Sequence, residues 1–158
     1  MCFLLHYDVT GINLGKSMSN RRILTYGTFD LLHIGHLRLL MRARALGDHL
    51  TVAISTDEFN LTEKSKTCVI PYADRALLVS NLKCVDEVIP ETTWDQKVRD
   101  VIDNKIDLFV MGDDWAGHFD FLKEHCDVHY LTRTPNISSS ELKQHINTNG
   151  KSAQHKRS

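Results

Sequence analysis

The segment YGTFDLLHIGHLRLL, residues 26–40, joins a short strand pattern to a helical one and decides the fold. The residues before it, 21–26 (RRILTY), are mostly apolar and partly β-branched or aromatic, which predicts a strand that ends at Gly27. Beyond the turn, leucine and methionine recur at helical spacing over residues 37–41, which predicts an amphipathic helix packed on a sheet. Two histidines therefore stand where this helix begins.

His33 and His36 are placed to bind an anion. The first N–H groups of a helix have no acceptor within the helix, and its dipole is positive at that end, so phosphate binds well there. Residues at i and i+3 project to one side of a helix, and each imidazole can donate a hydrogen bond without adding negative charge. Two alternatives stay open at this point: the histidines could cap and pack the helix, or they could ligate zinc, although no third ligand is suggested nearby.

Composition indicates one soluble domain without bulk affinity for nucleic acid. The chain has 158 residues with 42% hydrophobic content, enough for one full core. The formal charge is −1, from 19 basic and 20 acidic side chains, which argues against nucleic-acid partners and a basic membrane-binding surface. The four cysteines form no C-x-x-C pair, so we expect free thiols in a reducing compartment.

The ends of the chain differ in composition from its middle. The first residues show no convincing signal peptide, and no run reaches transmembrane length, so we expect a cytoplasmic protein with no membrane partner. Gly, Ser and Asn are frequent over residues 10–20, and the last residues are polar and basic. We therefore predict a flexible extension over 1–20, a domain over 21–146 and a flexible polar tail over 147–158.

Strand-like and helix-like segments alternate through the domain. Further strands are predicted over 49–56, 86–91, 106–114 and 128–133. Helices are predicted over 73–82, 93–105 (with Val98, Val101 and Ile102 inward), 119–125 and 138–146, and a polar loop over 60–72. This alternation predicts an α/β fold, a Rossmann-like, doubly wound, five-stranded parallel sheet with helices on both faces. Ligands of such sheets bind beyond the carboxyl ends of the strands.

Polar residues follow these strand ends, and the last of them forms a second candidate phosphate site. Residues 133–143 (RTPNISSSELK) supply a cation, three hydroxyls and a helix N-terminus. Ser138 and Glu141 also fit an ordinary capping box, and capping and binding are compatible.

Two motifs and the sequence between them resemble a known family. HIGH (33–36) resembles the H-x-G-H motif of the nucleotidyltransferase superfamily, and residues 133–140 resemble its R-T-x-G-I-S-T-T element. Over residues 22–146 the chain is similar to the cytidylyltransferases that act on glycerol 3-phosphate. The resemblance implies transfer of a cytidylyl group from CTP to sn-glycerol 3-phosphate, giving CDP-glycerol and pyrophosphate for teichoic-acid-type polymers. It also implies Mg²⁺ as cofactor and a homodimer.

The resemblance assigns roles position by position. It implies catalytic roles for His33, His36, Lys83 and Arg133. It implies nucleotide contacts for Thr28, Phe29, Ile34, Gly35, Asp114, Trp115, Thr134, Pro135, Asn136, Ile137, Ser138, Ser139 and Ser140. It implies acceptor contacts for Lys64, Lys66, Arg75 and Lys97, and a metal or His33-orienting role for Asp30.

Departures from the family pattern keep alternative functions open. Lys83 stands where the family usually has arginine, and Asn136 stands where it has glycine. The alternatives are a cytidylyl- or adenylyltransferase that uses ribitol, ethanolamine, choline or pantetheine phosphate, and a nucleotide-binding protein without turnover.

Overall fold

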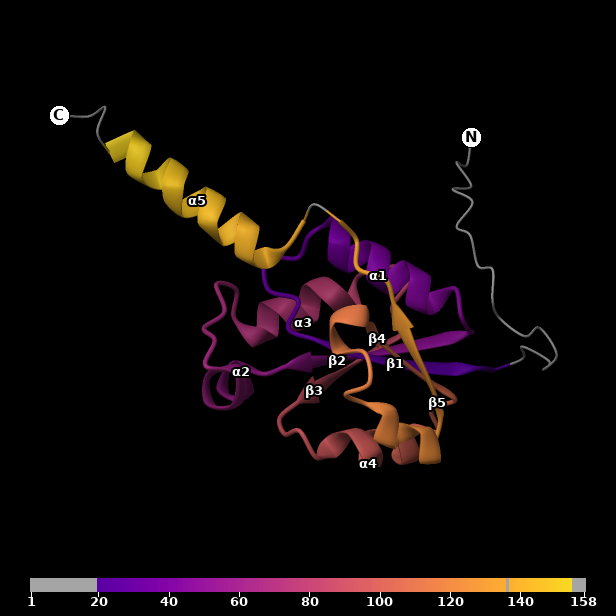
Figure 1. Ribbon diagram of the computed structural model, residues 1–158. Helices are drawn as coiled ribbons and strands as arrows, with labels where there is room; N and C mark the ends of the chain where they lie inside the picture. Colours follow the sequence, from indigo (N-terminus) through magenta and orange to yellow (C-terminus); the bar gives the residue numbers. More distant parts are fainter. Residues whose placement is uncertain (1–19, 136, 155–158) are drawn as a thin grey trace, which may run out of the picture.

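Five parallel strands form one sheet in the order β3-β2-β1-β4-β5 (Figure 1). This computed structural model describes residues 20–135 and 137–154. The strands are β1 (Arg22–Gly27), β2 (His49–Ser55), β3 (Glu87–Glu91), β4 (Leu108–Gly112) and β5 (Asp127–Leu131). The predicted Rossmann-like α/β fold with a five-stranded parallel sheet is confirmed.

The central strand, β1, is where the winding of the chain reverses. It pairs with β2 on one side and β4 on the other, with Leu24 opposite both Thr51 and Phe109. Its four inner residues are buried because both faces of the sheet are covered. A ligand site is therefore expected beyond Gly27, where the connections from β1 and β4 separate.

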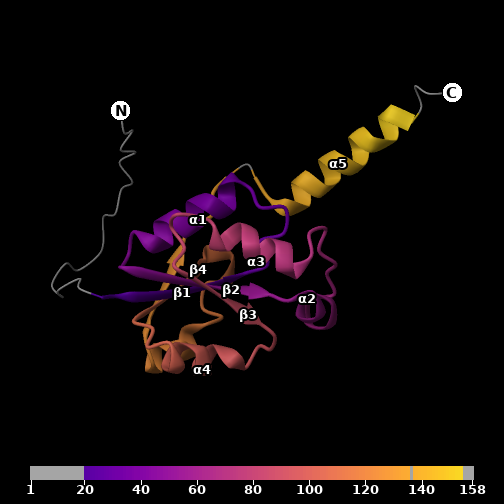
Figure 2. The same cartoon turned by 180° about the vertical axis from the view of Figure 1, so that it is seen from behind.

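Helices cover both faces of the sheet (Figures 1 and 2). One face carries α1 (Ile34–Arg44) and α3 (Tyr72–Ser80), and the core there joins Leu40 and Val79 to Val52 of the sheet. The other face carries α4 (Gln96–Asp103) and the 3₁₀ helix η2 (Asp120–Glu124), with Val101 and Leu122 packed near Phe109. A second 3₁₀ turn, η1 (Asp113–Trp115), follows β4.

The segment after β2 differs from the sequence prediction. Residues 57–64 form a helix, α2 (Asp57–Lys64), although residues 60–72 were expected to be a polar loop. Thr56 caps the helix by accepting a hydrogen bond from the N–H of Phe59, and Phe59 and Asn60 are the buried residues of the helix. Because Phe59 is the only apolar residue that this short helix buries, its sequence shows no clear helical period of apolar residues.

The inner face of α4 is more polar than its sequence pattern predicts. Val101 is buried as expected, but Ile102 is 54% exposed, so the expectation that it points inward is wrong. Gln96, Lys97 and Asp100 take the buried positions instead. Their polar atoms have partners within the protein, described below, which offset the cost of burying them.

The last helix, α5 (Ser139–Gln154), starts beside the loop that joins β1 to α1 and runs away from the body of the molecule (Figure 1). Its helical backbone continues past residue 146, the predicted end of the domain. The predicted extension over 1–20 lies almost wholly outside the described residues, as does the end of the predicted tail, 155–158.

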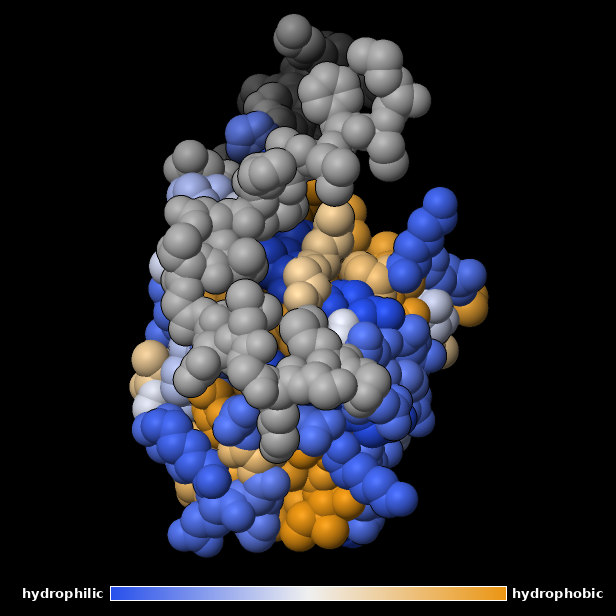
Figure 3. Space-filling view, turned by 90° about the vertical axis from the view of Figure 1, so that its right-hand side faces the viewer, coloured by the Kyte–Doolittle hydropathy of each residue, from blue (hydrophilic) through white to orange (hydrophobic). Residues whose placement is uncertain are grey.

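The surface is mixed in character. On the side seen in Figure 3 hydrophilic residues predominate, and hydrophobic ones show at the lower end and in the upper right part of that view. No helix in the described part of the chain is long and apolar enough to cross a membrane. Cys68, Cys84 and Cys126 are free thiols.

Candidate active site

A pocket of about 420 Å³ opens beyond the carboxyl ends of the strands, and its size suits a small-molecule ligand. The segments that follow β1, β2, β3, β4 and β5 all contribute to its lining. Predicted site residues that line it are Thr28, Phe29, Asp30, His33, Gly35, His36, Lys64, Lys66, Lys97, Asp114, Trp115, Arg133, Thr134, Ile137, Ser138, Ser139 and Ser140.

The loop from β1 to α1 approaches the pocket in a strained conformation. Phe29 (φ 53°) and Leu31 (φ 50°) lie in the left-handed region, which costs free energy for residues other than glycine. Such strain persists only where the surrounding structure holds it, and it is common at functional sites. Gly27 is required here, because a Cβ atom at that position would lie 2.7 Å from the Phe29 ring.

His33 and His36 cap the first turn of α1 through one nitrogen each. Nδ1 of His33 accepts a hydrogen bond from the N–H of Gly35 (3.1 Å), and Nδ1 of His36 accepts one from the N–H of His33 (3.4 Å). In a neutral imidazole the proton then sits on Nε2, so each ring keeps one N–H donor for a ligand. The capping and ligand-binding interpretations are therefore compatible.

Both imidazoles are neutral in the free protein at pH 7. Burial lowers the pKa of His36 to about 4, and the neighbouring His33 contributes in the same direction. Burial and the charge of Arg133 lower the pKa of His33 as well. Two neutral rings can stack without charge repulsion, and their Nε2–H groups present donors at the helix N-terminus.

A cationic recess lies on the β2–β3 side of the pocket. The Nζ atoms of Lys64 and Lys97 bind the same buried carboxylate, Glu91, at 3.2 Å and 2.7 Å. The hydroxyl of Ser55 donates to Glu91 and accepts from Lys64 (2.9 Å). Because two ammonium groups share one carboxylate, these three side chains together carry one net positive charge, which suits an anion.

Aromatic rings surround these two ammonium groups. Nζ of Lys97 lies 4.5 Å from the ring centroid of Tyr26 and 4.6 Å from that of Trp94. Nζ of Lys64 lies 4.7 Å from the centroid of Phe59. Cation–π contacts of this kind stabilise buried ammonium groups and leave their N–H donors free for a ligand.

A buried polar network supports the floor of the recess. The hydroxyl of Tyr26 donates to Asp100 (2.6 Å), and the side chain of Gln96 donates to the same carboxylate (2.6 Å). Burial and the Asp100 carboxylate raise the pKa of Tyr26, so it stays protonated as a donor. Gln96 also accepts from the backbone N–H of Thr92 (2.6 Å), which fixes the turn that leads to Trp94.

The opposite side of the pocket comes from the segments after β4 and β5. The backbone N–H of Arg133 donates to Asp113 (3.1 Å), which joins the two segments. Ser138 caps α5 by accepting from the N–H of Glu141 (3.2 Å), which is one of the two bonds of the predicted capping box, and its hydroxyl donates to the Glu141 carboxylate (2.9 Å). Arg133 is exposed, Trp115 is partly buried, and both line the pocket.

The structure is at odds with a magnesium-ligand role for Asp30. This side chain is buried, and its oxygens accept hydrogen bonds from the N–H groups of Leu31, Val69 and Ile70 and an ion pair from Lys143 (2.7 Å). Burial alone would raise the pKa of Asp30, but Lys143 and the Val69 and Ile70 amides together hold it below its ordinary value. No group of three or more metal-ligating side chains occurs among the described residues.

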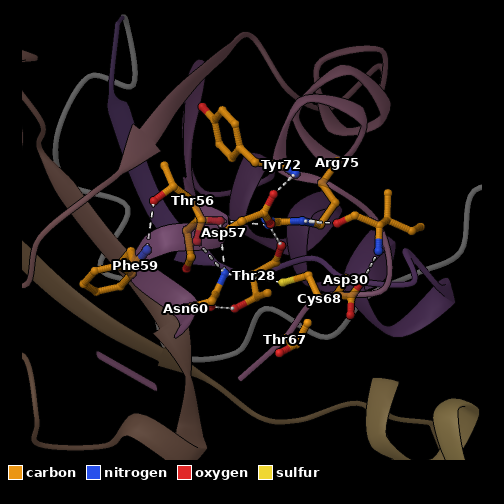
Figure 4. A network of polar contacts seen from close by, with 12 residues as sticks. Thr28, Asp30, Thr56, Asp57, Phe59, Asn60, Thr67, Cys68, Tyr72 and Arg75 are labelled. Atoms are coloured by element: carbon orange, nitrogen blue, oxygen red, sulfur yellow. Dashed lines mark hydrogen bonds and ion pairs between the residues drawn. The ribbon is translucent and has the colours of Figure 1, made fainter. Parts of the chain in front are cut away.

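Arg75 is a structural residue and not an acceptor contact. It is fully buried and absent from the pocket lining. Its guanidinium donates to the carbonyls of Thr28 (2.6 Å), Ser55 (2.9 Å) and Ile70 (2.9 Å) and pairs with Asp57 (Figure 4). It therefore ties together the ends of β1 and β2 and the segment before α3, and four of its five N–H donors are used within the protein.

Three further predicted residues are not brought to the pocket. Lys83 is exposed in the turn before β3, at the edge where strands begin, whereas the pocket lies at the edge where they end. Lys83 is therefore not brought to the pocket of its own chain. Ile34 is 47% exposed and Pro135 is exposed, and neither lines the pocket. Asn136 lies outside the described residues.

Glu91, Trp94 and Lys143 line the pocket but were not predicted from the sequence. Glu91 could have been found, because it is an acidic residue at the carboxyl end of a predicted strand. Trp94 resembled an ordinary helix-start residue, and Lys143 resembled a solvated helical lysine.

Known proteins resemble this chain in sequence and fold. A model of the cytidylyltransferase-like family matches residues 24–145. The glycerol-3-phosphate cytidylyltransferase of Bacillus subtilis (strain 168) is 57% identical over 126 residues, which cover 80% of this chain and 97% of that protein. The enzyme of that name from Staphylococcus aureus (strain NCTC 8325 / PS 47) is 52% identical over 126 residues, which cover 80% of this chain and 95% of that protein. A lipopolysaccharide core biosynthesis protein from Thermoplasma volcanium GSS1 shares the fold, with a TM-score of 0.65 and 26% identity over 72% of this chain and 98% of that one.

Proposed function

Since the chain belongs to the cytidylyltransferase-like family, we propose that it transfers a cytidylyl group from CTP to sn-glycerol 3-phosphate, releasing pyrophosphate and CDP-glycerol. The observation that carries this proposal is the placement of two anion sites in one pocket. The helix N-terminus with His33 and His36 is one, and the recess of Lys64 and Lys97 is the other. A nucleotidyl transfer to a phosphate requires this pairing.

In the proposed reaction an oxygen of the acceptor phosphate attacks the α-phosphorus of CTP. A new P–O bond forms, the bond to the β-phosphate bridging oxygen breaks, and pyrophosphate leaves with that electron pair. The attacking group is already an anion, so no general base is needed, and catalysis rests on positioning and on charge stabilisation. The Nε2–H groups of His33 and His36 donate to phosphate oxygens as negative charge develops there.

The two sides of the pocket take different substrates in this proposal. Lys64 and Lys97 hold the phosphate of glycerol 3-phosphate, and the exposed Lys66 lies at the mouth of the same side. Arg133 and the serines at the start of α5 hold the phosphates of CTP, with Asp114 and Trp115 on the nucleoside. Thr28, Phe29 and Gly35 line the pocket between the two substrate sides.

Four further features belong to the proposal. Mg²⁺ enters with the CTP phosphates, as is usual for an ion that keeps several waters and takes few protein ligands, and Asp30 is not a ligand to it. The enzyme is a homodimer, it works in the cytoplasm where CTP is made, and its product feeds teichoic-acid-type polymers.

The test is a pyrophosphate-release assay of CTP and of ATP against glycerol, ribitol, ethanolamine, choline and pantetheine phosphates. We expect kcat/KM for CTP with sn-glycerol 3-phosphate to exceed every other pair by roughly a hundredfold or more. A higher value with ATP or with another acceptor would replace the proposed substrates. Binding of CTP without turnover in any pair would favour a non-catalytic nucleotide-binding protein.

A further inference from the structure

Asp30 joins three segments of the chain at one buried carboxylate. Oδ2 accepts from the N–H of Val69 (2.9 Å) and from Nζ of Lys143 (2.7 Å), and Oδ1 accepts from the N–H of Ile70 (3.0 Å). Its backbone carbonyl also accepts from the hydroxyl of Ser139 (2.8 Å). Figure 4 shows Asp30 beside the segment of Thr67 and Cys68.

Each of these segments carries part of the pocket. Asp30 itself lies between the two left-handed residues Phe29 and Leu31, in the loop that leads to His33. Residues 65–70, here called the acceptor loop, follow Lys64 and include Lys66. The start of α5 supplies the serines assigned above to the CTP phosphates.

Lys143 pairs with Asp30 where α5 meets the body of the molecule. Its side chain is 35% exposed, whereas that of Asp30 is 5% exposed. Its Nζ also donates to the carbonyl of Thr67 (3.4 Å), so the helix and the acceptor loop lie against each other. Beyond this point α5 runs away from the sheet (Figure 1).

We propose that Lys143 and Asp30 are positioning residues, with Lys143 holding the start of α5 over the nucleotide side of the pocket and Asp30 holding both that helix and the acceptor loop. The proposal rests on the function proposed above. Lys143 acts mainly on the nucleotide side, because the acceptor loop loses only the long bond from Lys143 to Thr67 (3.4 Å) and keeps its two amide bonds to Asp30 when Lys143 is removed. Asp30 acts on both sides, because its carboxylate holds both segments.

The variants that separate these roles are K143M, K143R and D30N. K143M removes the ammonium and keeps most of the side-chain volume, and K143R restores the charge. D30N keeps the shape but replaces one acceptor oxygen with an amide donor, which faces another donor. K123M is the matched control, since Lys123 forms an exposed ion pair with Asp120 (2.8 Å) on η2 and does not line the pocket.

The first measurement is CTP binding by calorimetry without acceptor, followed by KM for each substrate. We expect K143M to weaken CTP binding roughly tenfold and to keep KM for glycerol 3-phosphate within about twofold of the parent value. K143R should restore CTP binding, and K123M should change neither quantity. D30N should raise both KM values. If Lys143 instead contacted CTP phosphates directly, D30N would free its ammonium and leave CTP binding equal or stronger, which would overturn the proposal.

The second measurement needs no ligand and does not depend on D30N folding. Hydrogen exchange of the amides at the start of α5 should be faster in K143M than in the parent and in K143R, because the helix has lost its attachment. Equal exchange rates, or CTP binding unchanged in K143M, would overturn the positioning role while the proposed function stood. A parent protein that binds no CTP would overturn both.

Discussion

The imidazole rings of His33 and His36 stack with their centroids 3.8 Å apart, and each ring caps the helix through Nδ1. We expect His33→Ala and His36→Ala each to lower kcat by about a hundredfold or more, because a preorganised donor is lost. Loss of the cap should also lower the free energy of unfolding by about 1 kcal/mol. Steady-state kinetics with denaturant titration separates the two effects, and His129→Ala, an exposed residue of β5, is the control. Near-normal kcat in either variant would refute the assignment.

The depressed pKa of His36 predicts a loss of stability in acid. Its pKa falls from 6.5 to about 4 on folding, so between these values the unfolded chain binds more protons than the folded one. The free energy of unfolding therefore rises with pH across this window, by on the order of 3 kcal/mol, and is insensitive to this group above it. Urea titrations at pH 7 and pH 4.5 measure the difference. It should shrink in His36→Asn, and an unchanged difference would assign the effect to other groups.

Lys64 and Lys97 should affect one substrate more than the other. Because both ammonium groups lie in the recess on the β2–β3 side, Lys64→Ala and Lys97→Ala should raise KM for glycerol 3-phosphate by roughly tenfold more than KM for CTP. Initial rates with each substrate varied in turn give this ratio. Equal increases in both KM values would place the lysines at the nucleotide.

Arg75 should matter for folding more than for binding. Arg75→Met removes the Arg75 hydrogen bonds from three backbone carbonyls and from Asp57, so we expect the free energy of unfolding to fall by about 3–5 kcal/mol. Arg75→Lys should recover part of this loss, since one ammonium cannot reproduce the fork of a guanidinium. Thermal and urea unfolding of the two variants check the order, and an unchanged midpoint in Arg75→Met would contradict it.

Lys83 should be dispensable. It is exposed at the edge of the sheet remote from the pocket, so Lys83→Ala and Lys83→Arg should keep the parent kcat/KM within about twofold. A loss of activity at protein concentrations where the parent is active would instead indicate a role outside this pocket, such as at a subunit contact.

The sequence predicted the sheet well because its signals are local. Apolar runs of strand length and the glycine turn at 27 are visible without any long-range contact. α2 was missed because only Phe59 and Asn60 anchor it, and the inner face of α4 was misjudged because its buried positions are polar. Hydrophobic periodicity in the sequence does not reveal a helix whose buried face consists mainly of hydrogen-bonded polar residues.

The candidate site was predictable wherever a residue and its neighbours share one turn. The histidine pair is such a case. Arg75 and Asp30 are the opposite case. In the sequence, a charged residue next to a motif resembles a ligand contact, and only the structure shows the backbone carbonyls and amides that it binds within the protein. Topology alone places Lys83 away from the pocket of its own chain, since a residue that precedes a parallel strand lies at the edge opposite the ligand site.

The reversal of winding at β1 divides the pocket between two parts of the chain. Lys64 and Lys97 come from the segments that follow β2 and β3, while Trp115 and Arg133 come from those that follow β4 and β5. Selectivity for the acceptor could therefore evolve in one pair of neighbouring crossovers while the nucleotide half is inherited unchanged. A single fold of this kind can diversify into enzymes that share one nucleotide donor and differ in the acceptor to which they transfer the nucleotidyl group.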